Sequence, residues 1–424
     1  MLKKSYKRQG VFYFMTIHNI CSYGAIGNGT IVTKAIQAAI DACMPGDAVL
    51  IPKGEYMSGA LFLKSDMELI LEKDSFLIGS EDIADYPIYN YRFEGRQEDC
   101  YASLINGQGD NITIRGEGTI NASGTALFRK EMREGKASRG RVIMLEKGKN
   151  IRIEGVTLRH APGWCLQVVY AENVTIENVK IHTKFNEKGV HYPDIYNGDG
   201  IDIDSTSHVV IRNCTIESGD DCIAIKSGRD AEGRKIGIPT KDVLIENCFF
   251  KSGFGVAIGS EMSGGVDGVL VRNCVFRNTF SIGTVKAPRP RGNAIRNIHF
   301  ENCVHENHVL DFVSCKWFKG AINIDQSYGY DVFDPAEEMP VSEDTPLIEN
   351  ISFKNCSLST MAGEAIYLCG LPEMPLRNIH LENIKASGKR GLFAHNVDGL
   401  TIKNLSLSST ETPAIRMTNV KNLK

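Results

Sequence analysis

Three aspartates within 23 residues have the types and the spacing that acid–base chemistry needs. Asp199 lies in the segment Asn197-Gly198-Asp199-Gly200, and the other two lie in Gly219-Asp220-Asp221. Like charges that are held close together raise the pKa of at least one carboxyl group. Such a group keeps its proton while its neighbour is ionised, and clusters of this kind are more often functional than structural.

The two aspartate segments are copies of each other, because a shift of 22 residues superposes them. The shift places Asp199 on Asp221, Ile201 on Ile223, Ile203 on Ile225 and Asp204 on Lys226. A third copy, 33 residues further on, places Phe254 on Asp221, Ala257 on Ala224 and Ile258 on Ile225. If each copy is one strand of a coil with about 4.8 Å between strands, then Asp199, Asp221 and Phe254 form one column, with Asp220 beside it. Asp204 and Lys226 are then expected to form a structural pair.

A longer repeat indicates which fold positions these copies. An aliphatic residue, any residue, an apolar residue, any residue and then Asn or Gly recur ten times from residue 112 onward. The copies begin at Ile112, Ile151, Val174, Val209, Val243, Val269, Ile298, Ile351, Ile379 and Leu400. Short strands with regular corners predict an all-β fold, a single right-handed parallel β-helix. Its asparagines are expected to form ladders at one bend.

Cysteines support the same fold. Cys214, Cys248, Cys274, Cys303 and Cys356 each directly follow an asparagine of the repeat, which predicts a column of small, buried, reduced thiols. An ordinary β-sandwich does not keep such a corner in register. Longer spacings predict loops that leave the coil at residues 128–139, 185–196, 229–240 and 326–345, and on a solenoid such insertions usually wall a binding cleft.

The N-terminal part is expected to contain a leader and a cap. Residues 1–16 are basic, and we expect them to form a disordered or leader segment. We expect residues 17–424 to form one β-helix domain. A short helix from a capping Thr33 through Cys43, with Ile36, Ala39 and Ile40 on one face, would plug the open end of the coil. The apolar run at residues 11–15 is too short for a signal peptide, so we expect a cytoplasmic protein.

Composition limits the partners. The chain has 48 basic and 51 acidic residues and a net charge of −3, which gives no indication of nucleic-acid binding. No apolar run is long enough to span a membrane. The sequence contains no Cys-x-x-Cys pair, so a zinc site is not expected. We expect no metal and no cofactor, and the sequence leaves the oligomeric state undetermined.

Several segments together resemble glycoside hydrolase family 28, the polygalacturonase family. The similarity starts at Tyr23-Gly24-Ala25 and covers nearly the whole chain. Residues 197–200 match the family's Asn-x-Asp-Gly motif, and residues 219–221 match its Gly-Asp-Asp motif. Residues 224–230 and 258–265 are similar to runs in exo-acting members. The resemblance implies an oligosaccharide substrate derived from pectin, with Asp220 as general acid and with Asp199 and Asp221 activating water.

Three positions depart from the family pattern. The usual Gly-His-Gly is Gly253-Phe254-Gly255, the Arg-Ile-Lys is Thr284-Val285-Lys286, and the Trp-x-x-His is Trp164-Cys165-Leu166-Gln167. Keeping the aspartates while losing up to three cations suggests hydrolysis of an altered substrate, with Phe254 either stacking on a deoxy-sugar or simply packing. The candidate substrate-binding residues are Asn197, Phe254, Lys286, Arg289, Arg291, Gln167 and Trp164. Arg296 extends the basic cluster of Lys286, Arg289 and Arg291, and Tyr196 could line a sugar cleft together with Trp164.

The sequence therefore favours an inverting glycoside hydrolase that is exo-acting and cleaves polygalacturonan-type or rhamnogalacturonan-type oligosaccharides. In such an enzyme one carboxyl group protonates the leaving oxygen, and a second activates water on the opposite face of the sugar. Other interpretations stay open. The aspartates could form a calcium site or a solvated acidic corner, and the chain could be a non-catalytic carbohydrate-binding β-helix or a polysaccharide lyase.

Overall fold

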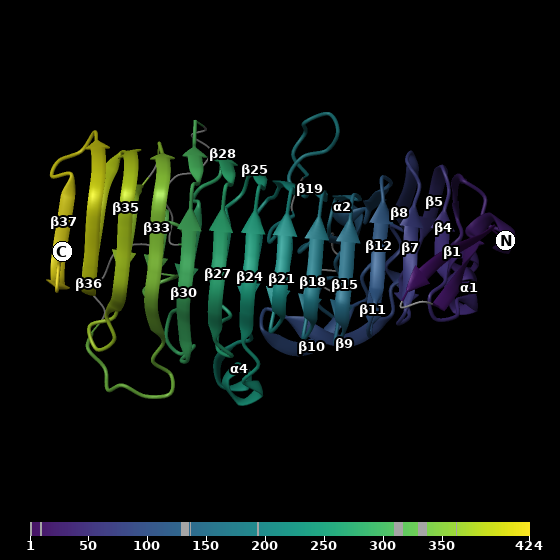
Figure 1. Ribbon diagram of the computed structural model, residues 1–424, viewed down its shortest axis with the longest axis horizontal. Coiled ribbons are helices and arrows are strands. Elements are labelled where there is room, and N and C mark those ends of the chain that lie inside the picture. The colour runs from purple at the N-terminus through teal and green to yellow at the C-terminus, as the bar shows by residue number, and fades with distance from the viewer. Residues whose placement is uncertain are drawn as a thin grey trace. The chain divides into compact units, whose positions relative to one another are not determined.

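The computed structural model describes residues 2–8, 11–128, 135, 137–192, 195–308, 317–329, 337–361 and 363–424, with side chains from residue 15 onward. The chain divides into two compact units. The first unit consists of Met1–Phe93 and Gln97–Gly200, and the second consists of Glu94–Arg96 and Ile201–Lys424. Each unit is a coil of short parallel strands, so the fold is the expected right-handed parallel β-helix (Figure 1).

Three parallel ladders build the first unit. One contains β4 (Ala48–Ile51), β7 (Met67–Leu71), β12 (Ile112–Gly116), β15 (Lys149–Glu154) and β18 (Glu172–Glu177). The second contains β5 (Gly54–Ser58), β8 (Ser75–Gly79), β13 (Thr119–Asn121), β16 (Thr157–Arg159) and β19 (Lys180–His182). The third contains β6 (Leu61–Leu63), β11 (Ile105–Gln108), β14 (Ile143–Glu146) and β17 (Leu166–Val169). Alternate side chains of these strands point into the coil and form its core.

Further elements complete the first unit. They are β1 (Leu2–Arg8), antiparallel to β2 (Val11–Asn19), then η1 (Ile20–Tyr23), β3 (Asn28–Ile31), η2 (Ile83–Asp85), the hairpin of β9 (Ile88–Phe93) and β10 (Arg96–Tyr101), and α2 (Gly124–Phe128). Strand β2 extends the first ladder by pairing with β4. Whether residues 1–16 are a leader stays a prediction.

The predicted capping helix is α1 (Thr33–Ala42). Ile36, Ala39 and Ile40 are fully buried, and the Gln37 side chain bonds both backbone groups of Phe62 in β6, at 2.9 and 3.1 Å. The helix thus covers the hydrophobic end of a coil, as expected. The prediction that Thr33 caps the helix was wrong. The N-cap is Val32 without a side-chain bond, because the Thr33 hydroxyl instead accepts from the Gly59 amide at 2.8 Å.

Three ladders also build the second unit. The β20 ladder contains β20 (Ile201–Asp204), β23 (Ile223–Lys226), β26 (Val256–Gly259), β29 (Gly283–Lys286), β32 (Gly320–Asp325) and β34 (Glu364–Cys369). The β21 ladder contains β21 (Ser207–Arg212), β24 (Thr240–Glu246), β27 (Val266–Arg272), β30 (Ala294–Glu301), β33 (Leu347–Ser359), β35 (Leu376–Gly388) and β36 (Arg390–Ser409). The third contains β22 (Thr215–Glu217), β25 (Phe249–Ser252), β28 (Val275–Arg277) and β31 (Val304–Glu306). Strand β37 (Ile415–Lys421) pairs with β36, and the strands of the β21 ladder lie side by side in Figure 1.

The register within the second unit agrees with the sequence repeat. Ile201 pairs with Ile223, Asp204 with Lys226, and Ala224 with Ala257. The asparagine ladder is confirmed, since the Asn302 amide donates to Asn273 at 3.2 Å and the pattern continues through Asn355, Asn383 and Asn404 at 2.9–3.1 Å. These asparagines have φ near +54°, a left-handed conformation that asparagine tolerates better than most residues. The five-cysteine column is also confirmed as buried free thiols.

Two insertions of the second unit lie near its first strands. Helix α4 (Asp230–Ile236) forms inside the loop predicted at 229–240. The hairpin tip at residues 94–96 contacts the start of this helix, where Arg96 binds Asp230 at 2.9 Å and Glu94 lies 3.5 Å from Arg229. Parts of the loops predicted at 128–139, 185–196 and 326–345 lie outside the described residues. None of the described helices combines the length and the hydropathy needed to cross a bilayer.

Candidate active site

In the first unit, backbone contacts fix the segment that carries Asp199. The Thr183 hydroxyl donates to the Gly198 carbonyl at 2.5 Å, and the Cys165 amide donates to the Asp199 carbonyl at 2.9 Å. The next bond of the same ladder joins the Leu166 amide to the Gly200 carbonyl at 3.1 Å. Asp199 itself is 3% exposed. The repeat therefore holds this carboxylate at the end of a strand rather than on a loose loop.

Arg139 clamps the residues that precede Asp199. Its Nη1 donates to the Tyr196 carbonyl at 2.7 Å, and its Nη2 donates to Oδ1 of Asn197 at 2.9 Å. The guanidinium also lies over the rings of Tyr196, at 4.5 Å, and Phe128, at 5.2 Å. Tyr196 is exposed and Asn197 is partly exposed, whereas Arg139 is 7% exposed. The sequence contained no pattern that singled out Arg139, because it comes from an irregular insertion.

Trp164 and Gln167 lie inside the first unit. The Trp164 ring packs 4.9 Å from the ring of Phe93 and lies under Arg141 at 5.4 Å. Gln167 is fully buried, and its amide donates to the Arg92 carbonyl of β9 at 3.2 Å. Gln167 of β17 and Trp164, which precedes β17, therefore both contact β9 of the hairpin. Their contact with substrate stays a prediction.

In the second unit, Asp220 and Asp221 have unequal surroundings. Nζ of Lys286 donates to Oδ2 of Asp221 at 2.8 Å, and Asp221 and Lys286 are 3% and 4% exposed. Burial and the adjacent charge of Asp221 raise the pKa of Asp220 to about 6. Burial alone would lower the pKa of Lys286, but the Asp221 carboxylate raises it above its ordinary value. The pair thus combines a carboxyl group whose pKa is raised, Asp220, with a carboxyl group that Lys286 binds, Asp221.

A second buried ion cluster adjoins this pair. Nζ of Lys226 lies 3.3 Å from Glu261 and 3.6 Å from Asp202. Burial opposes ionisation of Glu261, but Lys226 and Lys286 lower its pKa to about 2. Asp204 is adjacent to Lys226 in strand register, as predicted, and accepts from the Ser205 hydroxyl at 3.3 Å. Glu261 was not predicted as a site residue, although it lies in the exo-like run at 258–265.

Phe254 belongs to an aromatic cluster beside Lys286. Its ring stacks on Phe318 with 3.6 Å between centroids and lies 5.7 Å from Phe280. Nζ of Lys286 lies over the rings of Phe318, at 5.1 Å, and Tyr328, at 5.3 Å. Burial raises the pKa of Tyr328 to about 12. Phe318 and Tyr328 lie outside the recurring sequence motif, so no pattern in the sequence singled them out.

The arginines of the predicted basic cluster bind acidic residues of the second unit. Arg289 pairs with Glu373 through two guanidinium nitrogens, one of them at 2.7 Å. Arg291 donates to Asp230 at 2.5 Å and to the Ser260 carbonyl at 2.8 Å. Nε of Arg296 lies 3.7 Å from Glu349. Their role in substrate binding stays a prediction, whereas Lys286 directly contacts a candidate catalytic carboxylate.

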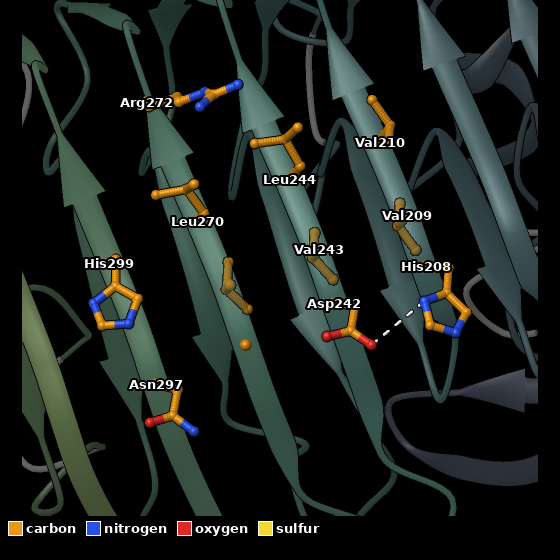
Figure 2. A pocket seen from close by; sticks show the side chains of 12 residues that line it. His208, Val209, Val210, Asp242, Val243, Leu244, Leu270, Arg272, Asn297 and His299 are labelled. Atoms are coloured by element: carbon orange, nitrogen blue, oxygen red, sulfur yellow. Dashed lines mark ion pairs between the residues drawn. The ribbon is translucent and has the colours of Figure 1, made fainter.

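A different hollow, of about 470 Å³, lies on the outer side of the β21 ladder (Figure 2). Val210, Leu244 and Leu270 form its apolar floor, and His208 and Asp242 lie 3.4 Å apart at its edge. Neither Asp220 nor Lys286 lines it. The hollow thus belongs to a face without the acid–base chemistry described above.

Comparisons with known proteins agree with this arrangement. The family model for glycosyl hydrolases family 28 matches residues 48–405. A probable polygalacturonase of Vitis vinifera is 30% identical over 383 residues, which cover 86% of this chain and 73% of that protein. An exo-poly-alpha-D-galacturonosidase of Dickeya chrysanthemi is 31% identical over 68% of this chain, and the match spans 55% of that longer protein.

A solved structure shows the same fold. The hyperthermoactive exopolygalacturonase from Thermotoga maritima superposes with a TM-score of 0.79 at 25% identity, over 96% of this chain and 91% of that one. The family match covers most of the strands and both aspartate segments. The chain therefore belongs to glycosyl hydrolases family 28 and is a glycoside hydrolase that acts on O-glycosidic bonds.

Proposed function

We propose that this hydrolase degrades pectin, removing sugars from one end of galacturonate-containing oligosaccharides with inversion at the anomeric carbon. One observation carries the proposal. Asp220 has a pKa of about 6 directly beside Asp221, whose carboxylate is bound by Lys286. A general acid needs a carboxyl group whose pKa is raised, as that of Asp220 is, and a general base needs a second carboxyl group nearby. The exo-acting mode is supported by the Dickeya chrysanthemi and Thermotoga maritima relatives.

Asp199 is assigned a catalytic role from its position in the repeat. Strand β20 begins two residues after Asp199, and β23 begins two residues after Asp221. These strands pair in parallel, with Ile201 opposite Ile223. We infer from this register that Asp199 and Asp221 occupy equivalent positions of the repeat and share the activation of water. Residues 17–424 would then form one catalytic domain.

Each aspartate has a separate role in this mechanism. Protonated Asp220 gives its proton to the glycosidic oxygen as the bond to the leaving sugar breaks. Asp199 and Asp221 remove a proton from a water molecule, which attacks the anomeric carbon from the opposite face. Separations of about 6.5–9.5 Å between the acid and the base leave room for that water. A single displacement inverts the anomeric configuration.

Recognition of the uronate is assigned first to Lys286, with Asn197 beside the acids in sequence. Arg289 and Arg291 are already paired with Glu373 and Asp230, so neither is a free cation for the uronate. The Phe254–Phe318 stack next to Lys286 favours a second candidate substrate, a backbone that alternates rhamnose with galacturonate. The rhamnose methyl face would pack on Phe254, and fewer carboxylates would need neutralisation.

Product analysis tests the proposal. Purified protein is incubated with homogalacturonan and rhamnogalacturonan oligosaccharides, and the first product is followed by proton NMR. We expect new reducing ends, no absorbance from an unsaturated sugar, release of the terminal unit first and an inverted anomer. Unsaturated products would mean a lyase, and binding without products would mean a carbohydrate-binding protein. Initial retention of configuration would mean that one aspartate is a nucleophile.

A further inference from the structure

Arg139 donates a hydrogen bond to Asn197, and the direction of this bond determines which way the Asn197 amide faces. Nη2 of Arg139 lies 2.9 Å from Oδ1 of Asn197. A guanidinium has donors only, so the amide oxygen of Asn197 must face it. The Asn197 amide nitrogen, with its two hydrogens, therefore points away from Arg139. Among the described residues, Arg139 is the side-chain partner recorded for Asn197, and Asn197 remains partly exposed.

Other contacts keep the clamp rigid. Arg139 holds the neighbouring Tyr196 carbonyl at 2.7 Å and the Pro162 carbonyl at 3.3 Å, while the Tyr196 ring covers its charge at 4.5 Å. Gly163 makes room for the guanidinium, because a Cβ at this position would lie 3.0 Å from Nη1 of Arg139. Asn197 has a φ of +50°, a left-handed backbone conformation that asparagine adopts more readily than most residues. The Arg139 contact then sets which end of the amide faces the guanidinium.

We propose that Arg139 is a positioning residue that turns Asn197 into a hydrogen-bond donor for an acceptor oxygen of the sugar. The acceptor is either the uronate carboxylate or a ring hydroxyl, since both accept from an amide. Asn197 lies two residues before Asp199, so this donor would act next to the scissile bond. The inference rests on the proposed function for the location of the substrate, but the orientation of the amide follows from the Arg139 contact alone.

Four variants separate the donor from the clamp. Asn197→Asp keeps a partner for Arg139, and strengthens it through charge, but replaces the donor by a second carboxylate oxygen. Arg139→Met removes the clamp, and Arg139→Lys keeps the charge without the planar fork. Gly163→Ala displaces the guanidinium without changing any polar group. Thermal unfolding of each variant reports whether it is folded.

Binding of trigalacturonate and of its methyl ester is measured by calorimetry, and KM and kcat are measured where turnover occurs. We expect Asn197→Asp and Arg139→Met to weaken binding of trigalacturonate by about tenfold to a hundredfold. Arg139→Lys and Gly163→Ala should lie between them and the unmodified protein. KM should rise more than kcat falls. A carboxylate acceptor predicts a smaller loss for the methyl ester, and a hydroxyl acceptor predicts equal losses.

The outcomes distinguish the two proposals. Binding of trigalacturonate by folded Asn197→Asp within twofold of the unmodified protein would overturn the donor. Unchanged binding by folded Arg139→Met and Gly163→Ala would overturn the positioning role. If the unmodified protein binds but does not cleave, the proposed hydrolysis fails while the variants still decide the inference. If it neither binds nor cleaves any uronate oligosaccharide, both are wrong.

Discussion

Two faces of the second unit use charged residues in opposite ways. On the β20 ladder, strands β20, β23, β26 and β29 are buried on both sides, and their outward side chains include Asp202, Asp204, Lys226 and Lys286. On the β21 ladder, the outward column alternates in sign along the register. Its members are Arg212, Glu246, Arg272, Glu301, Lys354, Glu382 and Lys403.

The difference shows what each face is built for. In the alternating column each neighbour of a charge has the opposite sign, and Arg272 binds Glu246 at 2.7 Å in partly exposed surroundings. On the β20 face, Asp220 is adjacent to Asp221, and the neighbouring lysines are buried with them. Buried charge costs stability even when it is paired, but it shifts pKa values. The face of the β20 ladder can carry chemistry, whereas the face of the β21 ladder stabilises the coil.

The largest contrast is expected from removing one cation on each face. Lys286→Met leaves the buried Asp221 carboxylate without its ion pair, which should lower the free energy of unfolding by about 3–5 kcal/mol. Arg272→Met removes one exposed partner and should cost about 0.2–1 kcal/mol. Urea denaturation at pH 7 measures both. Equal losses would mean that Lys286 does not neutralise Asp221 in the folded protein.

The second contrast is catalytic. Asp220→Asn removes the proposed proton donor and should lower kcat by at least ~10²-fold while KM changes little. Asp242→Asn is the matched control on the other face, where asparagine suits the φ of +54° and the carboxylate is exposed beside His208. That variant should keep normal turnover. Near-normal kcat in Asp220→Asn would remove Asp220 from its role.

The third contrast concerns pH and stability. The folded-state pKa of Asp220 is raised from 3.8 to about 6, so the folded state favours its protonated form. Stability from this group is therefore present below pH 4 and is lost as pH rises toward 6. Asp220→Asn should be more stable than the unmodified protein above pH 6, by ~1–3 kcal/mol, and the two should converge below pH 4. Activity should fall as pH rises above 6. A variant that is less stable at pH 7 would contradict the raised pKa.

The smallest expected effect concerns substrate choice on the β20 face. Phe254→His replaces an apolar ring by a hydrogen-bonding one, and should shift the ratio of kcat/KM for trigalacturonate over a rhamnogalacturonan oligosaccharide by about tenfold. The unmodified protein should prefer the rhamnogalacturonan oligosaccharide. Equal or faster cleavage of trigalacturonate by the unmodified protein would refute the preference.

The regular part of the fold could be predicted because it repeats. The spacing of Ile201, Ile223 and Val256 predicts where the strands lie, which face of each strand is buried and how neighbouring strands pair. This is possible because every second side chain of a strand enters the core. The capping helix was predicted for the same reason, from its apolar face, although its N-cap is Val32 rather than Thr33. Chemistry-bearing residues inside the repeat, such as Asp221, were therefore found.

Residues supplied by insertions could not be predicted in this way. Arg139, Phe318 and Tyr328 reach partners that lie far away in the sequence. Lys286 is 32 residues from Phe318 and 42 from Tyr328, and Arg139 is 58 residues from Asn197. No local period determines such contacts. The same holds for Arg289, whose pairing with Glu373 depends on two loops that leave the coil at different rungs.

The cysteine column has a consequence for handling the protein. Ten of the eleven described cysteines are buried free thiols, and Cys21 alone among them is exposed. A thiol-reactive probe should therefore label Cys21 in the folded protein and reach the others only after denaturation. Mass spectrometry before and after unfolding checks this. Cys21 would then serve as a native attachment point for a fluorophore or a solid support, far along the sequence from both aspartate segments.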